Sequence, residues 1–473
     1  MSVFESPLTD KQMSRLTTIL LVCGLVLLSS CSNSSSRKLF DGANLEDWQT
    51  SGNVLVRDSS LILSGFNSRA ALKNSVYKNF DLHLRARTTS GGTGYIAFHT
   101  DDSEKGYRVA INNDNDAPIW WKKTGSLLSV RNLTKSFVKE GQWFDMDIRV
   151  EGQAITVKVN GEPVVEYIEP EHPYRVSPNE KALLSEGTIE LISNGQGDVE
   201  FKDIFIETID GRGIDTAAQF AQAGDEQTDE IIRLHQEDFP VLDYHVHLKG
   251  GLTKEVAAAQ SRRLGINYVV APNCGIGFPI TDDEGVYCFL DSMRTQPFIL
   301  AMQGEGREWP TTFSEAARKE FDFVFTDALT FTDRKGRRVR LWIDDEVFID
   351  NEQEYMDLIV EKMCDVFKEP ADIYVNPFFL PTQMNDRYDM FWTDQRVNKV
   401  IAALKQSGKV LEINELYQIP SKAIIMKAKE AGLKFSFGTN NVKPEVGKLE
   451  YAIRMKKECG LKAQDMYKPK IKL

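Results

Sequence analysis

The stretch that decides the fold of the second half of the chain is Asp243-Tyr244-His245-Val246-His247-Leu248, at the end of the apolar run 239–242. Such a run predicts a short strand, and alternate residues of a strand point to the same face. We therefore expect His245 and His247 to project together, with Asp243 close enough to orient one ring. Two imidazoles held in this way are typical ligands of one divalent metal ion.

Strand-like and helix-like segments alternate over the rest of residues 239–473. Apolar runs at 266–271, 298–302, 323–325, 373–375, 410–413 and 435–437 alternate with helical patterns such as 253–263 and 352–367. This alternation predicts parallel strands, in a distorted TIM-like (βα) barrel of seven or eight strands. A polar residue directly follows each strand, at the barrel edge where enzymes keep their chemistry. The residues expected to converge there are His245, His247, Glu305, Asp327, Asn376, Glu412 and Asn440.

No histidine follows His247, so carboxylates, amides or a thiolate must complete any metal site. We expect one divalent ion (Zn, Mn or Fe), because two histidines and one carboxylate with open positions suit these metals. The predicted metal ligands are His245, His247, Glu305 and Asn440, with Asp327 or the Cys274 thiolate as alternatives. A remnant pocket without metal is the other interpretation.

Two acids and two further polar residues complete the predicted site. Glu412 or Asp327 is the candidate general base, although each could equally hold a hydrogen-bond network. Asn376 and Arg307 are candidate substrate contacts, and a surface ion pair is the alternative for Arg307.

This half resembles the polymerase-and-histidinol-phosphatase family of metal-dependent hydrolases. The resemblance rests on the Asp-x-His-x-His opening, Gly304-Glu305, Glu412-Ile413-Asn414 and Phe437-Gly438-Thr439-Asn440. It implies a seven-stranded distorted barrel in which His245, His247 and Glu305 bind metal. Where the family has further His or Asp ligands, this chain has Asn273-Cys274, Asn376 and Asn440-Asn441-Val442. One metal ion is therefore expected in place of the family's two or three, since a neutral amide is a poorer ligand than a carboxylate.

Residues 38–210 carry a different pattern. Runs such as 81–87, 144–150 and 154–159 alternate apolar and polar residues, with turns such as Asn160-Gly161 between them. This pattern predicts a β-sandwich. Trp120 and Trp121 could offer an exposed face to a pyranose ring, although adjacent residues of a strand point opposite ways and one of the pair would then be core.

The same half resembles the 3-keto-disaccharide hydrolase family of concanavalin-like jelly rolls. Its landmarks are Leu39-Phe40-Asp41-Gly42, Asn79-Phe80-Asp81-Leu82, Gly141-Gln142-Trp143-Phe144 and Phe201-Lys202-Asp203-Ile204. The resemblance implies a carbohydrate or glycoside substrate. Arg108, Ala110 and Asn194 stand where the family tends to have Glu, Gln and His, so sugar binding or simple packing is the alternative to catalysis in this domain.

The chain begins with a leader. Lys11 and Arg15 precede the apolar run 19–28, which ends in Leu28-Ser29-Ser30-Cys31 and resembles a bacterial lipobox. We expect residues 1–31 to be a lipoprotein signal peptide, with lipid on Cys31 and a tether at 32–37. A plain signal peptide or a short anchor is the alternative. The predicted location is the cell envelope, at the outer membrane.

Composition narrows the possible partners. The 473 residues carry a net charge of −12, which disfavours nucleic acid as a partner. Six cysteines do not make a disulfide framework, although a Cys274–Cys288 bridge is conceivable. Residues 211–238 are expected to be a linker with a short helix, in which His235 is exposed.

Three functional hypotheses follow. The first is an envelope lipoprotein with a metal-assisted hydrolase or lyase site for glycosides in the barrel and a sugar-binding sandwich. The second is a non-catalytic carbohydrate-binding or scaffold lipoprotein. The third is a phosphoesterase, which the loss of a multi-metal cluster disfavours.

Overall fold

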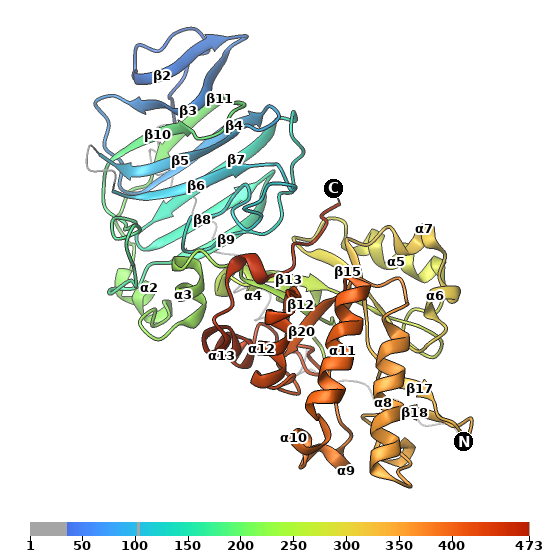
Figure 1. Cartoon of the computed structure of the whole chain (residues 1–473). Helices are drawn as coiled ribbons and strands as arrows, with labels where there is room; N and C mark the ends of the chain where they lie inside the picture. Colours follow the sequence, from blue (N-terminus) through green and yellow to red (C-terminus); the bar gives the residue numbers. More distant parts are fainter. Residues whose placement is uncertain (1–35, 102–104, 473) are drawn as a thin grey trace, which may run out of the picture.

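The computed structural model describes residues 36–101 and 105–472, which form two domains joined by a short helical segment (Figure 1). The predicted leader and the lipidation site at Cys31 lie outside the described residues. Within the described ranges, no helix has the length and apolar character needed to cross a bilayer.

The N-terminal domain is one antiparallel sheet, in the strand order β6-β5-β10-β3-β11-β4-β7-β8-β9, with β1 beside β11 and β2 beside β3. Figure 1 shows that it curves strongly, like a half-barrel. Its strands are β1 (Ser36–Lys38), β2 (Trp48–Arg57), β3 (Ser60–Leu72), β4 (Phe80–Thr88), β5 (Thr93–Thr100), β6 (Tyr107–Asn112), β7 (Phe144–Glu151), β8 (Ala154–Val159), β9 (Glu162–Ile168), β10 (Thr188–Ser193) and β11 (Asp198–Thr208).

Alternation along β4 shows why these residues form a sheet with a core on one side. Phe80, Leu82, Leu84 and Ala86 are almost completely buried, and the polar residues between them lie at the opposite face. The prediction of a β-rich domain is confirmed. In the described residues, however, its main strands belong to one continuous curved sheet.

The C-terminal domain is a parallel barrel with the strand order β12-β13-β15-β16-β19-β20-β21. The backbone N–H of Asn440, just after β21, donates to the His245 carbonyl of β12 at 2.8 Å and brings the ends of the sheet together. The predicted parallel arrangement of seven or eight strands is confirmed: seven strands follow one another along the sheet, and one short strand pairs beside them. The strands are β12 (Leu242–Val246), β13 (Asn267–Val270), β15 (Ile299–Gly304), β16 (Phe323–Thr326), β19 (Ile373–Tyr374), β20 (Val410–Asn414) and β21 (Phe435–Gly438), with β14 (Asn273–Cys274) beside β15.

Helices cover the outside of this barrel (Figure 1). The Thr253 hydroxyl accepts from the Val256 N–H and caps the first of them, as its sequence predicts. The longer helices are α4 (Lys254–Leu264), α5 (Asp283–Met293), α8 (Glu352–Val366), α11 (Asp394–Ser407), α12 (Lys422–Glu430) and α13 (Glu450–Cys459). Short helices are α6 (Trp309–Thr312), α7 (Glu315–Arg318), α9 (Thr382–Asn385) and α10 (Tyr388–Phe391), and β17 (Thr330–Thr332) pairs with β18 (Arg338–Arg340).

The predicted linker is an ordered part of the domain interface. It contains α2 (Thr216–Gln222) and α3 (Glu230–Gln236). The expectation that His235 is exposed is wrong: its ring is buried, Nε2 donates to the Gly265 carbonyl at 2.8 Å, and Nδ1 accepts from the Asn132 N–H at 3.4 Å. Burial holds the pKa of His235 far down, at about 3, so the ring stays neutral.

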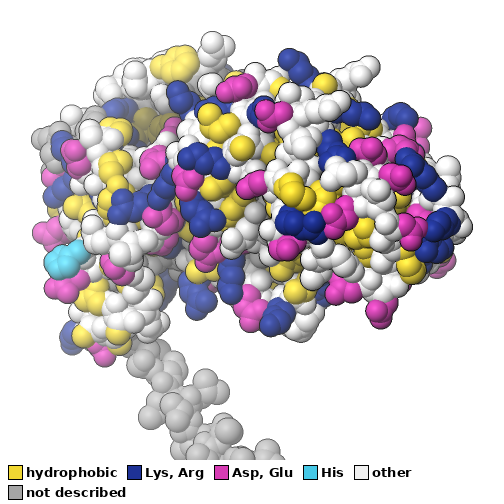
Figure 2. All heavy atoms as spheres, turned by 60° about the horizontal axis from the view of Figure 1, so that its bottom comes forward, with side chains coloured by type: hydrophobic (Ala, Val, Ile, Leu, Met, Phe, Trp, Pro, Cys, Tyr) yellow, Lys and Arg dark blue, Asp and Glu magenta, His cyan; other side chains and the backbone are white. Residues whose placement is uncertain are grey.

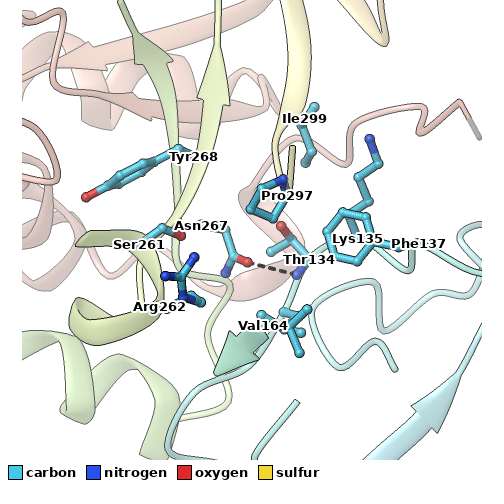
Figure 3. A pocket seen from close by; sticks show the side chains of 11 residues that line it. Thr134, Lys135, Phe137, Val164, Ser261, Arg262, Asn267, Tyr268, Pro297 and Ile299 are labelled. Atoms are coloured by element: carbon cyan, nitrogen blue, oxygen red, sulfur yellow. Dashed lines mark hydrogen bonds between the residues drawn. The ribbon is translucent and has the colours of Figure 1, made fainter. Parts of the chain in front are cut away.

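Polar contacts between the domains fix their relative position. The Thr134 N–H donates to Asn267 Oδ1 at 3.3 Å (Figure 3). Asn267 Nδ2 donates to the Asn132 carbonyl at 2.9 Å. The buried Lys135 ammonium donates to the Phe298 carbonyl at 2.9 Å. These contacts join the loop 113–136 of the β-domain to the start of the barrel, so the interface is part of the folded structure.

The outer surface mixes the two signs of charge. Figure 2 shows lysine and arginine side chains interspersed with acidic ones over one face of the molecule. A mixed face of this kind builds no broad field of a single sign.

Candidate functional site

The carboxyl ends of the barrel strands bring the predicted polar residues together. All are nearly fully buried, with exposed fractions of 0% to 8%: His245, His247, Glu305, Asp327, Asn376, Glu412 and Asn440. We call this set, with the residues bonded to it, the barrel mouth. The roles proposed for these residues stay predictions.

His245 and Glu412 form the centre of the barrel mouth. His245 Nδ1 lies 2.6 Å from Glu412 Oε1, and Nε2 lies 3.2 Å from Gln303 Oε1. Both ring nitrogens of His245 therefore have an oxygen atom as partner, and neither points into open space. A glycine is required nearby, since a Cβ at Gly438 would lie 2.3 Å from Glu412 Oε1 and 2.7 Å from His245 Cβ.

Glu412 has both carboxylate oxygens occupied. Besides the bond to His245, its Oε2 accepts from the Asn376 N–H at 2.7 Å and from Asn414 Nδ2 at 2.8 Å. In this structure Glu412 therefore holds its neighbours in place and has no free oxygen to act as the predicted general base.

The His247 ring has a hydrogen-bond partner at only one of its two nitrogens. Its Nδ1–H donates to the Ala271 carbonyl at 2.7 Å, which leaves Nε2 unprotonated and without a partner among the described residues. Burial and the nearby His245 hold the pKa of His247 well below its usual value, so its imidazole is neutral. The sequence suggested that Asp243 orients one of the two rings. In the structure Asp243 instead accepts hydrogen bonds from the backbone N–H groups of His245 and Thr439.

Glu305 and Asp327 are a buried carboxyl pair. Burial, followed by the charge of Asp327, raises the pKa of Glu305 to about 8, so Glu305 is protonated at neutral pH. Burial also raises the pKa of Asp327. Glu305 Oε1 accepts from Asn273 Nδ2 at 2.6 Å, whereas Asp327 is bonded at both oxygens, to the Leu329 N–H and to Asn376 Nδ2 at 2.9 Å each.

Asparagines link these carboxyl groups. Asn376 Oδ1 accepts from Asn440 Nδ2 at 2.8 Å and from Asn414 Nδ2 at 3.0 Å. Asn376 and Asn440 both adopt the left-handed conformation, with φ of 49° and 51°, which asparagine tolerates better than most residues. Strained backbone of this kind is common at functional sites.

The barrel mouth does not provide the predicted set of metal ligands. In residues 36–101 and 105–472, no group of three His, Cys, Asp or Glu side chains is arranged to hold a metal ion. His245 Nε2 faces Gln303, Glu305 Oε1 faces Asn273, and the Asn440 amide bonds Asn376. The side chains present therefore do not fit a metal ion in this arrangement, and the ion itself stays a prediction.

Cysteine offers no alternative ligand here. Cys274 is buried and free, and burial raises the pKa of its thiol far above the usual value, which disfavours the thiolate. Cys288 is also free, so the conceivable Cys274–Cys288 bridge is absent from the structure.

Arg307 is engaged inside the protein. Its guanidinium forms a half-buried ion pair with Glu369 at 2.8 Å and donates to the Asp327 carbonyl at 2.6 Å. The guanidinium supports the strand ends of the barrel. The ion pair that the sequence offered as the alternative for Arg307 is thus formed, and its role as a substrate contact stays a prediction.

Trp120 and Trp121 do not form an exposed platform. Both lie in a turn rather than a strand, with exposed fractions of 5% and 8%, and their rings meet edge to face at 5.8 Å. Trp121 Nε1 donates to Asp238 Oδ1 at 2.8 Å. Both residues are buried against the barrel domain, and they line a hollow between the domains.

Several residues of the barrel mouth were missed by sequence reasoning. Gln303 and Asn414 each lie two positions from a predicted residue, Glu305 and Glu412, and so share its face of the strand. This spacing of two residues along a strand is the sequence feature from which Gln303 and Asn414 could have been predicted. Lys249 and Tyr417 lie in loops, and the charges of the mouth act on their pKa values: burial raises that of Tyr417 to about 12, with Asp327 and Glu305 adding to it.

The two domains can now be classified. The first is an antiparallel β-domain, and the second is a TIM-like barrel with buried acid, amide and imidazole groups at its mouth. Residues 35–207 match the profile of the 3-keto-alpha-glucoside-1,2-lyase-like domain. This match covers the β-domain and less than half of the chain, and no curated protein matches the sequence.

Solved structures similar to the chain cover a comparable share of it. A glycosyl hydrolase-like protein from Parabacteroides distasonis is 16% identical, with 43% of this chain and 99% of that chain covered and a TM-score of 0.33. A second one from the same organism is 22% identical, with 37% and 100% covered and a TM-score of 0.31. The carbohydrate-binding module CBM66 from Bacillus subtilis is 14% identical, with 34% and 96% covered and a TM-score of 0.27.

Proposed function

We propose that this protein acts on carbohydrate in the cell envelope: the β-domain binds saccharide, and the barrel mouth cleaves a glycosidic or related C–O bond. The observation that carries the proposal is the match of residues 35–207 to a domain named for action on a glucoside. The barrel mouth supports the enzymatic part, because strongly shifted pKa values in one buried cluster are typical of catalytic sites.

The two groups with unused atoms suggest the chemistry. Glu305 is protonated at neutral pH, and its Oε2 has no partner among the described residues. The neutral His247 presents an unprotonated Nε2. An acid and a base of this kind can cleave a C–O bond. Glu305 would protonate the leaving oxygen, while His247 would take a proton from an attacking water in hydrolysis, or from carbon in an elimination.

This proposal routes no step through a metal ion. Metal analysis of the full-length chain, purified without chelators, tests that choice. Close to one equivalent of Zn, Mn or Fe that is lost when His245 and His247 are both replaced by Ala would contradict the hydrogen-bonded arrangement. It would favour the metal-assisted form of the hypothesis.

Turnover tests the acid–base assignment. Neutral and acidic oligosaccharides are incubated with the protein, and the masses of the products distinguish hydrolysis, which adds one water, from elimination, which does not. Glu305→Gln is expected to lower kcat by about 10²- to 10⁴-fold, the usual contribution of a general acid. The exposed Glu320→Gln is the matched control. Equal rates for the two variants would contradict the role of Glu305.

A non-catalytic carbohydrate-binding protein is the second candidate. It is favoured by the hydrogen bonds that occupy both oxygens of Asp327 and of Glu412. Binding of saccharides without any product would support this alternative over the first.

The envelope location is a proposal that rests on the lipobox-like end of the leader at Cys31. The wild-type chain is expected to take up labelled fatty acid and to sediment with membranes. Cys31→Ser should do neither, because the thiol that accepts the lipid is missing. Labelling that survives in Cys31→Ser would contradict lipidation at this residue.

A further inference from the structure

A hollow of about 540 Å³ lies between the two domains, apart from the barrel mouth. Its volume falls within the range of about 300–1,000 Å³ usual for small-molecule sites. One side is formed by the loop of the β-domain that carries Trp120 and Trp121, and the other by the C-terminal segment after α13 and by Lys434. We call it the interdomain hollow.

Aromatic and apolar groups form part of its wall. Trp120, Trp121 and Met466 line the hollow, and each is more than nine-tenths buried. The Trp121 indole is fixed by its bond to Asp238, whereas the Trp120 indole N–H has no acceptor among the described residues. A fixed indole surface with a spare donor suits a ligand that has both C–H and oxygen atoms, as a pyranose has.

The charge of the hollow is opposite to that of the whole protein. Lys434, Lys462 and Lys468 line it, and no aspartate or glutamate does so in the described part of the chain. The protein as a whole carries a net charge of −12. A local group of three ammonium ions in an acidic protein attracts an anion to this place.

Two of these lysines are positioned by backbone carbonyls. Lys468 Nζ donates to the carbonyls of Asp116 and Ala117 at 2.5 and 3.2 Å, and Lys434 Nζ donates to the Gln464 carbonyl at 2.5 Å. An ammonium has three N–H donors, so both groups keep at least one for a ligand. Lys462 is exposed at the rim.

We propose that the interdomain hollow binds an acidic saccharide, one whose ring carries a carboxylate or a sulfate. This inference rests on the proposed carbohydrate function and specifies the class of saccharide. The ring lies against the apolar wall to which the edges of the tryptophans and Met466 contribute. The anionic group accepts charge-assisted hydrogen bonds from the lysines, which are stronger than neutral ones.

Calorimetric titration of the full-length protein tests this proposal with three probes: trigalacturonate, a sulfated galactose oligosaccharide and maltotriose, which is neutral. At least one acidic probe is expected to bind, and more weakly as salt is raised, because salt screens partly exposed charges. Comparison of the two acidic probes identifies the anionic group. Lys462→Gln and Lys468→Met are each expected to weaken binding about tenfold, whereas Lys405→Gln, an exposed lysine on α11, should have no effect.

The outcomes separate this inference from the proposed function. Equal affinity for maltotriose and the acidic probes, or unchanged affinity in both lysine variants, would overturn the inference and leave carbohydrate action standing. If none of the three probes binds and no oligosaccharide is cleaved, the proposed function fails as well. Because Lys462 is exposed, its replacement should not disturb folding, and a matching melting temperature verifies this.

Discussion

The barrel mouth and the interdomain hollow differ in how their polar groups are used. In the mouth, acids, amides and an imidazole bond mainly to one another and are almost completely buried, as with Glu412 and Asn376. In the hollow, the lysines and the Trp120 indole border an open volume and keep unused donors. Polar residues at the ends of barrel strands therefore do not by themselves make an open site, because they can satisfy one another.

The part of the chain that matches a family and the candidate catalytic groups lie in different domains. The matched residues 35–207 form the β-domain, whereas Glu305 and His247, whose pKa values are clearly shifted at the candidate site, lie in the barrel. The hollow lies between the two. A saccharide held there would be in contact with both domains.

The largest expected effect is on the closed network. Glu412→Ala should lower the free energy of unfolding by about 3–5 kcal/mol, because it leaves the buried His245 ring, the Asn376 N–H and the Asn414 amide without their acceptor. Urea denaturation measures this loss, with the exposed Glu308→Ala as the control. A loss below about 1 kcal/mol would show that the mouth is not held together in this way.

The second expected effect is a change in the pH dependence of stability. The pKa of Glu305 is raised from 4.5 to about 8. The favourable contribution of Glu305 to the free energy of unfolding is therefore fully present below about pH 4.5 and is lost as the pH rises through about 8. Glu305→Gln cannot ionise and should not lose stability in this way. Between about pH 4.5 and pH 8 the free energy of unfolding of the variant should therefore rise relative to that of the wild type by up to about 1.4 kcal/mol per pH unit.

Urea denaturation at a series of pH values checks the prediction for Glu305. The control Glu320→Gln should leave the slope unchanged, because Glu320 is exposed. A slope that Glu305→Gln does not alter would mean that Glu305 is ionised in the folded protein.

A smaller effect is expected at the wall of the hollow. Trp121→Phe keeps an aromatic ring but removes the indole N–H that donates to Asp238, which should cost about 1 kcal/mol of stability. Thermal unfolding measures it. Asp238→Asn keeps an acceptor oxygen for the indole and tolerates the left-handed backbone at this position, so it should lose only the partly exposed ion pair with Lys122 and less stability than Trp121→Phe. A loss in Trp121→Phe that is no larger than in Asp238→Asn would mean that the bond is not the main contribution.

The smallest effect is expected at the rim of the hollow. Lys462→Gln should change the free energy of unfolding by less than about 0.5 kcal/mol, since the side chain is exposed. A large loss of stability would mean that Lys462 supports the fold and that its effect on saccharide binding is indirect.

Local patterns in the sequence determined much of the fold. Apolar runs predicted the seven barrel strands along the main path of the sheet, and the helical pattern at 253–263 predicted α4. Strict alternation, as in β4, predicted the β-domain. These features follow from short-range geometry, because the periods of strands and helices are visible within a few residues.

The tertiary structure alone decided the state of each polar group. Glu412, which bonds His245, lies 167 positions away in the sequence, and Asn441, which bonds His247, lies 194 away. No local pattern reveals which nitrogen of a ring faces which oxygen. The sequence could therefore place His245 and His247 side by side at the end of one strand. Only long-range contacts made one ring the hydrogen-bond partner of a carboxylate and left the other neutral with a free nitrogen.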